Sequence, residues 1–380
     1  MGEEVRRLLF NNLKNISGWR TRDKLVVFAV DDYGNVRLDS SSARDKLIQA
    51  GLDLSSRFDQ VDALETRQDL EALFEVLSSV SDSRGHPAIF TPYTLCANLD
   101  FDAVSAERRF YCYEELPQTF ERLAESQPAQ YVNAWALWQE GISQGLLKPQ
   151  FHGREHLNVK LFERKLHAGD HAVSVNLANQ SLAAVGRDAS MPGVGFTHAF
   201  GIWDRSEIEN HREILKDGLR LFEKTFGFSS TTFTPPAQTI HPDLYPYLES
   251  LGIEGIFKPR WCYRRIDRDR QVREINLSER QREYQHMSLV RNVVFEPTDN
   301  NSKDSVHIAI DQVAAAFRWR RPAMISSHRV NFSGHIDEKN RARGLDALRL
   351  LLRKIVNRWP DVQFISADQL VERIALAQGE

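Results

Sequence analysis

The segment that most constrains the fold is a run of six apolar residues, Leu25 to Val30, followed at once by two aspartates, Asp31 and Asp32. A short, uninterrupted apolar run of this kind is typical of a strand that is buried on both faces. Two adjacent carboxylates at the end of such a strand are costly to bury unless a metal or a reaction uses them. The run therefore predicts a buried strand whose carboxyl end carries chemistry.

Short apolar runs recur along the chain and alternate with segments of helical periodicity. One helix is expected over residues 204–226, where Asp204 and Glu207 resemble a capping box and Gly227 ends the helix. Further strands are expected at residues 87–91, 150–151, 231–234, 255–257, 289–295, 323–326 and 362–365. This alternation predicts an α/β fold in which helices cross over between parallel strands.

The length of the chain, 380 residues, is large for an average domain, but α/β barrels reach this size as one unit. Two stretches interrupt the alternation, at about 157–201 and 260–301. Long insertions in a barrel usually lie in loops over the active face. No internal repeat, low-complexity tract or linker divides the sequence, so we expect one domain over residues 1–380 with two insertions.

The composition excludes several classes of protein. The net charge is −3, which provides no general electrostatic attraction to nucleic acid or to an anionic membrane. No apolar run is long enough to span a membrane, and the apolar residues near the N-terminus, Leu8 to Phe10, are too few for a signal peptide. The three cysteines form no CxxC pair, so they supply neither a disulfide framework nor a thiolate zinc site. We therefore expect a soluble, cytoplasmic protein.

Two histidines four residues apart, His152 and His156, follow the short run Gln150-Phe151. Together with Asp32 they supply three nitrogen and oxygen ligands and leave a position for water, which is typical of a catalytic divalent metal. Simpler interpretations exist. Asp31 could cap a turn, Asp32 could pair with Arg37, and the two histidines could lie on a polar surface. We interpret the chain as a metal-dependent hydrolase.

Five motifs in one order resemble the polysaccharide deacetylases, also called the NodB-homology domain or carbohydrate esterase family four. The resemblance covers about residues 31–370. The motifs are Ala29-Val30-Asp31-Asp32-Tyr33-Gly34, the pair His152 and His156, Phe233-Thr234-Pro235-Pro236-Ala237, the segment from His241-Pro242-Asp243-Leu244 to Leu251-Gly252-Ile253, and Ile325-Ser326-Ser327-His328. The resemblance implies a distorted (β/α) barrel of about seven parallel strands.

The same resemblance implies a metal site and a mechanism. Asp32, His152 and His156 would hold a divalent metal, most simply zinc, which lowers the pKa of a bound water and polarises the acyl carbonyl. Asp31 would be the base that takes the proton of the water, and His328 the acid that protonates the leaving group. His328 could instead be a buried structural histidine beside Arg329.

The resemblance also implies candidate substrate contacts. A backbone N–H near Ala237 could stabilise the oxyanion. His198 lies in an insertion that we expect over the active face, which makes it a candidate for substrate contact.

The chain departs from the family at Thr234, where the family has an arginine that orients the catalytic carboxylate. Two possibilities follow. Another cation takes this role, with Arg37 and Arg291 as candidates, or the base is weakly oriented and activity is low or lost.

The function that the resemblance implies is removal of an acetyl group, N-acetyl rather than O-acetyl, from a carbohydrate. Two alternatives stay open: hydrolysis of a non-sugar amide or imide on the same fold, and a non-catalytic, metal-containing protein that binds carbohydrate. A cytoplasmic location would favour a small or lipid-linked sugar over a mature cell-wall polymer. The sequence does not indicate the oligomeric state.

Overall fold

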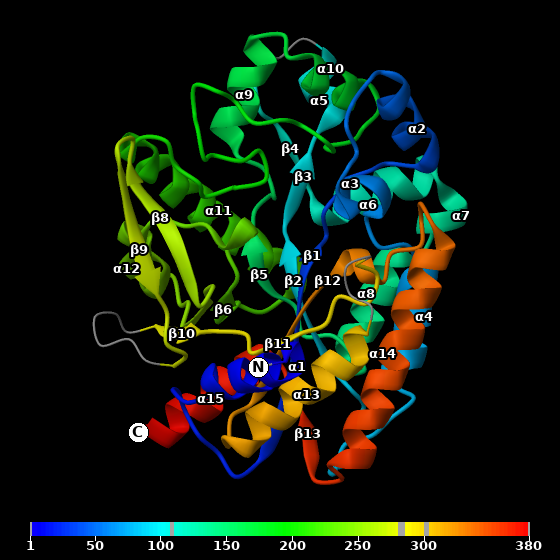
Figure 1. Cartoon of the computed structure of the whole chain (residues 1–380). Helices are drawn as coiled ribbons and strands as arrows, with labels where there is room; N and C mark the ends of the chain where they lie inside the picture. Colours follow the sequence, from blue (N-terminus) through cyan, green and yellow to red (C-terminus); the bar gives the residue numbers. More distant parts are fainter. Residues whose placement is uncertain (1, 107–109, 280–285, 300–303, 379–380) are drawn as a thin grey trace.

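The computed structural model describes residues 2–106, 110–279, 286–299 and 304–378. Within these residues one sheet of nine strands forms the centre of the molecule, and helices surround it (Figure 1). Eight strands follow one another in the order β10 (Met287–Leu289), β7 (Gly255–Phe257), β6 (Thr232–Phe233), β5 (Gln150–Gly153), β2 (Phe90–Leu95), β1 (Lys24–Tyr33), β12 (Ala323–His328) and β11 (Val293–Val294). All pairs between them are parallel, which confirms the predicted α/β class.

The ninth strand, β13 (Val362–Phe364), lies on the same side of β1 as β2 does. It pairs with the first residues of β1, Lys24–Val26, whereas β2 pairs with β1 from Phe28 onward. Two small antiparallel sheets lie outside the main one: β3 (Ala97–Leu99) with β4 (Tyr113–Glu115), and β8 (Trp261–Asp267) with β9 (Arg270–Ile275).

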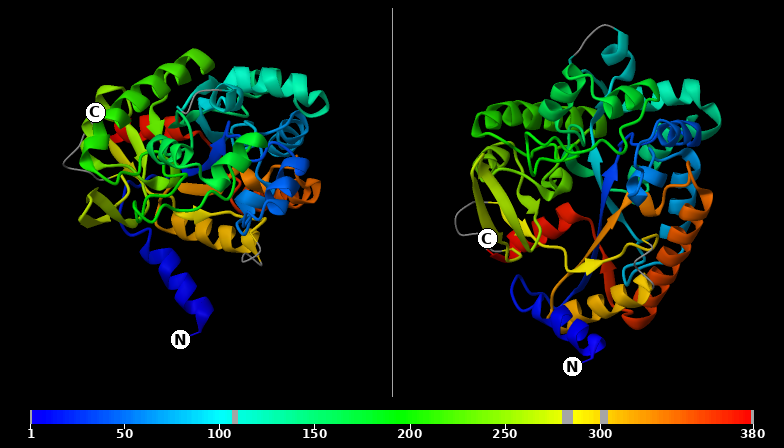
Figure 2. Two further views of the ribbon diagram at one scale, coloured as in Figure 1. Left: turned by 90° about the horizontal axis from the view of Figure 1, so that it is seen from above. Right: turned by 45° about the horizontal axis from the view of Figure 1, so that its top comes forward.

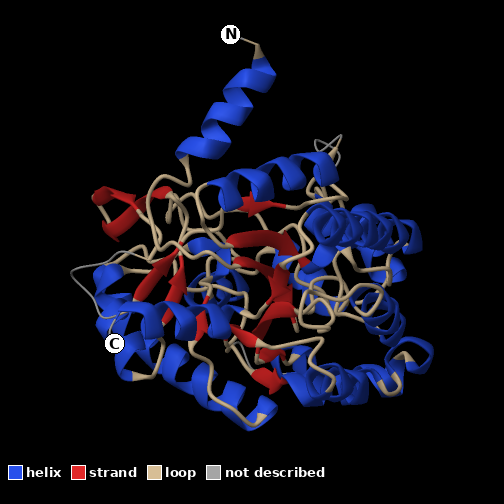
Figure 3. Cartoon of the chain, turned by 90° about the horizontal axis from the view of Figure 1, so that it is seen from below, coloured by secondary structure: helices blue, strands red, loops and turns tan. Residues whose placement is uncertain are grey.

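Helices pack around the sheet, as Figure 3 shows from below. In chain order they are α1 (Glu3–Leu13), α2 (Ser41–Gln49), α3 (Arg57–Val61), α4 (Arg67–Leu77), α5 (Phe101–Ala106), α6 (Leu116–Ser126), α7 (Pro128–Tyr131), α8 (Ala134–Ser143), α9 (Val159–His167), α10 (His171–Ala178), α11 (Ile208–Phe226), α12 (Tyr245–Ser250), α13 (Ser305–Arg318), α14 (Glu338–Arg358) and α15 (Ala367–Gln378). The predicted start of the helix at 204–226 is a one-turn 3₁₀ segment with the Asp204–Glu207 capping box, and Gly227 ends α11 with a left-handed φ of 77°. No described helix has the length and apolar character needed to cross a bilayer.

Strand β1 is buried along nearly its whole length because both of its faces pack against apolar side chains. Val26, Phe28 and Val30 belong to the main hydrophobic core. The alternate residues Leu25, Val27 and Ala29 belong to a second cluster, which α15 completes. This explains the continuous apolar run: a strand with two buried faces has no position for a polar residue until it ends.

The prediction of a single strand over 289–295 is wrong. Leu289 ends β10 and Val293 begins β11, and these two strands lie at opposite ends of the eight-strand order. The segment between them leaves the sheet because Asn292 donates hydrogen bonds to Asn15 and to the Pro322 carbonyl. Four residues span at most ~14 Å, so the sheet must curl until its two ends are within that distance.

The two predicted insertions have different structures. Residues 157–201 carry α9 and α10, which lie at the top of Figure 1, beyond the carboxyl ends of the strands. Residues 260–301 include the β8–β9 hairpin and the two short strands β10 and β11. Within this second insertion, residues 280–285, 300 and 301 lie outside the described part of the chain.

Candidate active site

The five residues predicted to bind the metal or to transfer protons line one cavity of about 520 Å³: Asp31, Asp32, His152, His156 and His328. The two aspartates come from the end of β1, His152 from β5, and His328 from the end of β12; His156 follows β5 by three residues. In a parallel sheet the carboxyl ends of all strands meet at one edge, so residues far apart in sequence converge there.

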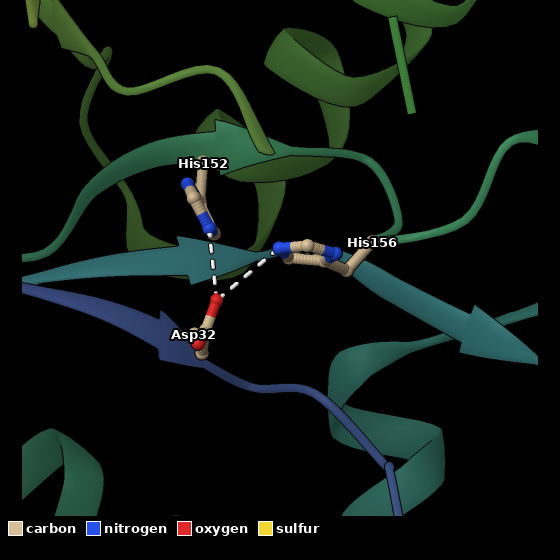
Figure 4. Close-up of side chains that lie close together, drawn as sticks. All are labelled: Asp32, His152 and His156. Carbon is tan, nitrogen blue, oxygen red and sulfur yellow. Dashed lines mark hydrogen bonds and ion pairs between the residues drawn. The ribbon is translucent and has the colours of Figure 1, made fainter. Parts of the chain in front are cut away.

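Asp32, His152 and His156 point toward one another (Figure 4). The Asp32 Oδ1 atom lies 3.2 Å from the Nε2 atom of His152 and 3.2 Å from the Nε2 atom of His156. Their ligand atoms all lie within 4.8 Å of one another. Two bonds of ~2.1 Å at a tetrahedral angle place the donor atoms ~3.4 Å apart, so these separations fit a single small divalent ion.

Hydrogen bonding assigns the donor atom of His152. Its Nδ1 atom lies 2.6 Å from the backbone carbonyl of Thr234, and a carbonyl can only accept, so Nδ1 carries the proton. In the neutral ring, Nε2 then has a free lone pair directed at Asp32, which is how metal-binding histidines are held. Burial lowers the pKa of His156, although Asp32 partly offsets this effect, so the neutral ligand form of His156 is favoured.

The backbone of Asp32 explains how two consecutive carboxylates enter the same cavity. Alternation along a strand would send Asp31 and Asp32 to opposite faces. Asp32 instead has a left-handed φ of 74°, and the register between β1 and β2 shifts between Val30 and Tyr33. A non-glycine residue in this region costs about 1–3 kcal/mol, and such strain concentrates at functional sites.

The surroundings of Asp32 favour its ionised form. Burial raises the pKa of this carboxyl group, but the contacts with the ring nitrogens of His152 and His156 outweigh burial and hold the pKa well below its usual range. The site therefore presents one carboxylate and two imidazoles, a donor set that suits zinc and similar ions.

Asp31 forms a two-pronged ion pair with Arg291. The guanidinium donates from Nη1 to Oδ2 and from Nη2 to Oδ1, each at 2.6 Å, and Nη2 also donates to the Thr234 hydroxyl at 3.0 Å. Both side chains of the pair are buried. Thr234 thus contacts an arginine that arrives from the segment between β10 and β11.

The other candidate cation, Arg37, has a different partner. It lines the cavity, but its guanidinium donates to Asp59 at 2.7 Å. In the structure Asp31 pairs with Arg291, and Arg37 pairs with Asp59 rather than with Asp32. Of the two candidate cations, Arg291 is the one that lies at Asp31.

His328 is held by a carboxylate that sequence reasoning did not assign. Its Nδ1 atom lies 2.7 Å from Glu296 Oε1, and Glu296 is itself bound by the Arg57 guanidinium and by Asn331 Nδ2. Burial lowers the pKa of His328, but the charge and hydrogen bond of Glu296 outweigh this and raise it to about 9. The other ring nitrogen, Nε2, lies 4.0 Å from Asp31 Oδ2.

The register of the sheet explains why Glu296 reaches His328. Val293 and Val294 of β11 pair with Ile325 and Ser326 of β12, so the same register continued by two residues places Glu296 beside His328. The only signal in the sequence was that Glu296 follows an apolar run. This signal could identify Glu296 as a partner of His328 only if it were known that the apolar run forms two strands and that the second strand, β11, pairs with β12.

The remaining candidates lie at the edge of the cavity or beside it. Ala237 lines the cavity in a left-handed conformation with a φ of 52°. His198 lines an adjoining hollow of about 130 Å³, and its Nδ1 atom accepts a hydrogen bond from the Gly195 N–H at 3.1 Å. Its neighbour Thr197 lines the main cavity.

No protein-family model matches the sequence, and no curated protein matches it. Solved structures with a similar fold include a putative polysaccharide deacetylase from Mycobacterium smegmatis, with 11% identity, a TM-score of 0.44, and coverage of 96% of this chain and 94% of that one. A probable polysaccharide deacetylase from Pseudomonas aeruginosa PAO1 has 9% identity, a TM-score of 0.44, and coverage of 92% and 91%.

A 4-alpha-glucanotransferase from Thermococcus litoralis is also similar, with 9% identity and a TM-score of 0.45. This likeness covers 93% of the present chain but only 40% of that protein. Identities and TM-scores as low as these support no conclusion about activity, which must come from the site.

Proposed function

We propose that the protein is a metal-dependent hydrolase that removes an acetyl group, N-acetyl rather than O-acetyl, from a carbohydrate. The observation that carries the proposal is the convergence of one carboxylate and two imidazoles within ion-binding distance, in a cavity that also contains an aspartate and a histidine suited to proton transfer. Asp32, His152 and His156 would hold the ion, most simply zinc. When bound, it would supply Lewis acidity and lower the pKa of a water.

Asp31 is the proposed general base. Arg291 fixes the plane of its carboxylate and uses one lone pair on each oxygen, so a second lone pair on each stays available for a proton. The Thr234 hydroxyl, by accepting from the same guanidinium, helps to fix Arg291 in turn.

His328 is the proposed general acid. Its raised pKa of about 9 keeps the ring protonated at neutral pH. Glu296 accepts at Nδ1, so the proton on Nε2 is available to the nitrogen or oxygen that leaves with the sugar.

The walls of the cavity suit a sugar ring. Tyr263 lines the cavity from strand β8, and its side chain is 69% exposed, so its ring can stack on the apolar face of a pyranose. Gln238 and Thr239 line the same cavity and offer polar groups to hydroxyls.

The test measures metal content and acetate release together, on a panel of N-acetylated and O-acetylated sugars. His152→Ala should lose both metal and turnover, whereas Asp31→Asn should keep the metal and lose most turnover. His171→Ala is a matched control, because His171 is exposed, its Nε2 atom lies 3.0 Å from the Ala50 carbonyl, and it does not line the cavity. Equal metal content and activity in His152→Ala and the parent would reject the site.

The same assays separate the alternatives. Hydrolysis of a cyclic amide or imide would open a ring without releasing acetate. A protein that only binds carbohydrate would take up zinc and ligand, but Asp31→Asn would then match the parent in rate.

A further inference from the structure

The N-terminal helix α1 is turned the opposite way from an ordinary surface helix. Two of its polar residues contact the rest of the protein: Arg7 pairs with Asp311 at 3.2 Å, and Asn12 accepts from the Arg318 guanidinium and the Trp319 indole. Asn11 and the following Asn15 are buried. The apolar residues lie outward: Val5, Leu8, Leu9, Phe10 and Leu13 are between 42% and 62% exposed.

Helix α1 packs against α13 but extends beyond the rest of the molecule. The left view of Figure 2 and Figure 3 show α1 projecting outward from the other helices. A surface helix normally buries its apolar stripe against its own core, and a contiguous exposed apolar face marks an interaction site.

A cluster of arginines lies beside α1. A hollow of about 330 Å³ is lined by Arg20, Thr21, Arg22, Arg318, Trp319 and Arg320. All four of these arginines are exposed, and no ion pair within the described ranges involves any of them. Positive charge is concentrated near this surface although the net charge of the whole chain is −3. Residues 1–22 contain five basic and two acidic residues.

The arginine cluster lies at the opposite end of the sheet from the cavity. Arg20 and Arg22 precede β1, and Arg318 and Arg320 precede β12, whereas Asp31 and His328 lie at the opposite ends of these strands. A ten-residue strand is ~33 Å long, so the two sites are separated by about that distance.

We propose that α1 and the arginine cluster form a surface that binds an anionic lipid bilayer. Such a bilayer presents an apolar layer for the outward face of α1 and, next to it, negative headgroups for the arginines. A second copy of the chain fits less well, because a two-fold interface would bring the two arginine clusters together. The proposal does not rest on the proposed function, and the bound protein would keep its cavity open to water.

Vesicle sedimentation at low salt tests the proposal. The full chain should sediment with phosphatidylcholine vesicles that contain one third phosphatidylserine, much less with phosphatidylcholine alone, and less at high salt. Leu9→Glu/Leu13→Glu should lower the partition coefficient on the order of a hundredfold. Arg318→Gln/Arg320→Gln should lower it about thirtyfold, since each arginine near the surface contributes about fivefold.

Leu350→Glu is the matched control, because Leu350 on α14 is 48% exposed, as is Leu9, and lies outside this surface. It should bind vesicles as the parent does. Absence of binding by the parent to the phosphatidylserine vesicles, or equal binding by the parent and Leu9→Glu/Leu13→Glu, would overturn the proposal. So would light scattering that finds a dimer without vesicles and a monomer for Leu9→Glu/Leu13→Glu.

Discussion

The ion pair between Arg291 and Asp31 should stabilise the protein as well as orient the proposed base. Both side chains are at most 7% exposed, and two hydrogen bonds of 2.6 Å join them. Replacing Arg291 with Met leaves a buried carboxylate without its cation. Breaking a buried pair in this way costs about 3–5 kcal/mol of folding free energy.

A double-mutant cycle isolates the pair. Urea unfolding of the parent, Arg291→Met, Asp31→Asn and the double variant, with the metal removed, gives the coupling free energy. We expect at least ~2 kcal/mol, because the double variant removes both charges and escapes most of the penalty. Additive losses, within ~0.5 kcal/mol, would refute the reasoning.

A second-site variant tests the same geometry. The Thr234 hydroxyl lies 3.0 Å from the Arg291 guanidinium, so an arginine at residue 234 can reach the carboxylate once Arg291 is gone. Thr234→Arg in the Arg291→Met background should recover a measurable part of the lost stability and turnover, whereas Thr234→Lys, without a planar fork, should recover less. No recovery by Thr234→Arg would mean that the two positions do not serve one carboxylate.

Three further predictions follow from the site and the core. Glu296→Gln should lower the pKa of His328, which is about 9 in the parent, so the loss of turnover as pH rises should occur at lower pH; an unchanged pH–rate profile would contradict the role of Glu296. Burial, with the nearby charge of His241, lowers the pKa of His211 to about 4. As the pH falls, His211 is therefore protonated in the unfolded state before it is protonated in the folded state. The free energy of unfolding should fall by at most ~3 kcal/mol between pH 6.5 and pH 4. His211→Leu should remove that part of the pH dependence in urea unfolding, and an unaltered dependence would contradict the assignment. Tyr263→Ala should raise KM for a sugar substrate with little change in kcat, whereas Tyr263→Phe keeps the ring and should behave as the parent; equal effects of the two changes would argue against stacking.

Local patterns predicted much of the fold because the elements concerned have strong local signals. The run Leu25 to Val30 has apolar residues at every position, and β1 is buried on both faces. The capping box at Asp204 and the glycine at 227 mark the ends of a helical segment through backbone requirements that act within a few residues. Such signals need no knowledge of the rest of the chain.

The division of residues 289–295 into two strands could not be predicted in this way. Leu289-Val290-Arg291-Asn292-Val293-Val294-Phe295 has the composition of one strand. Hydrogen bonds from Asn292 to Asn15, 277 residues away, and to Pro322 take the middle of the segment out of the sheet. Tertiary contacts override the local preference there.

The same limit applies to the site. Asp32, His152 and His156 could be proposed because each follows a predicted strand, and the structure brings them together. Arg291 was one of two candidate cations, and only the fold decides between them, since it places Asp59 next to Arg37. Glu296 was missed because its contact with His328 depends on the register of β11 against β12.

The central claim is that Asp32, His152 and His156 bind one metal ion. Anomalous scattering from crystals grown with zinc tests it most directly. We expect a single strong peak within ~2.0–2.2 Å of Asp32 Oδ1 and of the Nε2 atom of each histidine. A map without a peak at that point, in crystals whose zinc is bound elsewhere or not at all, would contradict it.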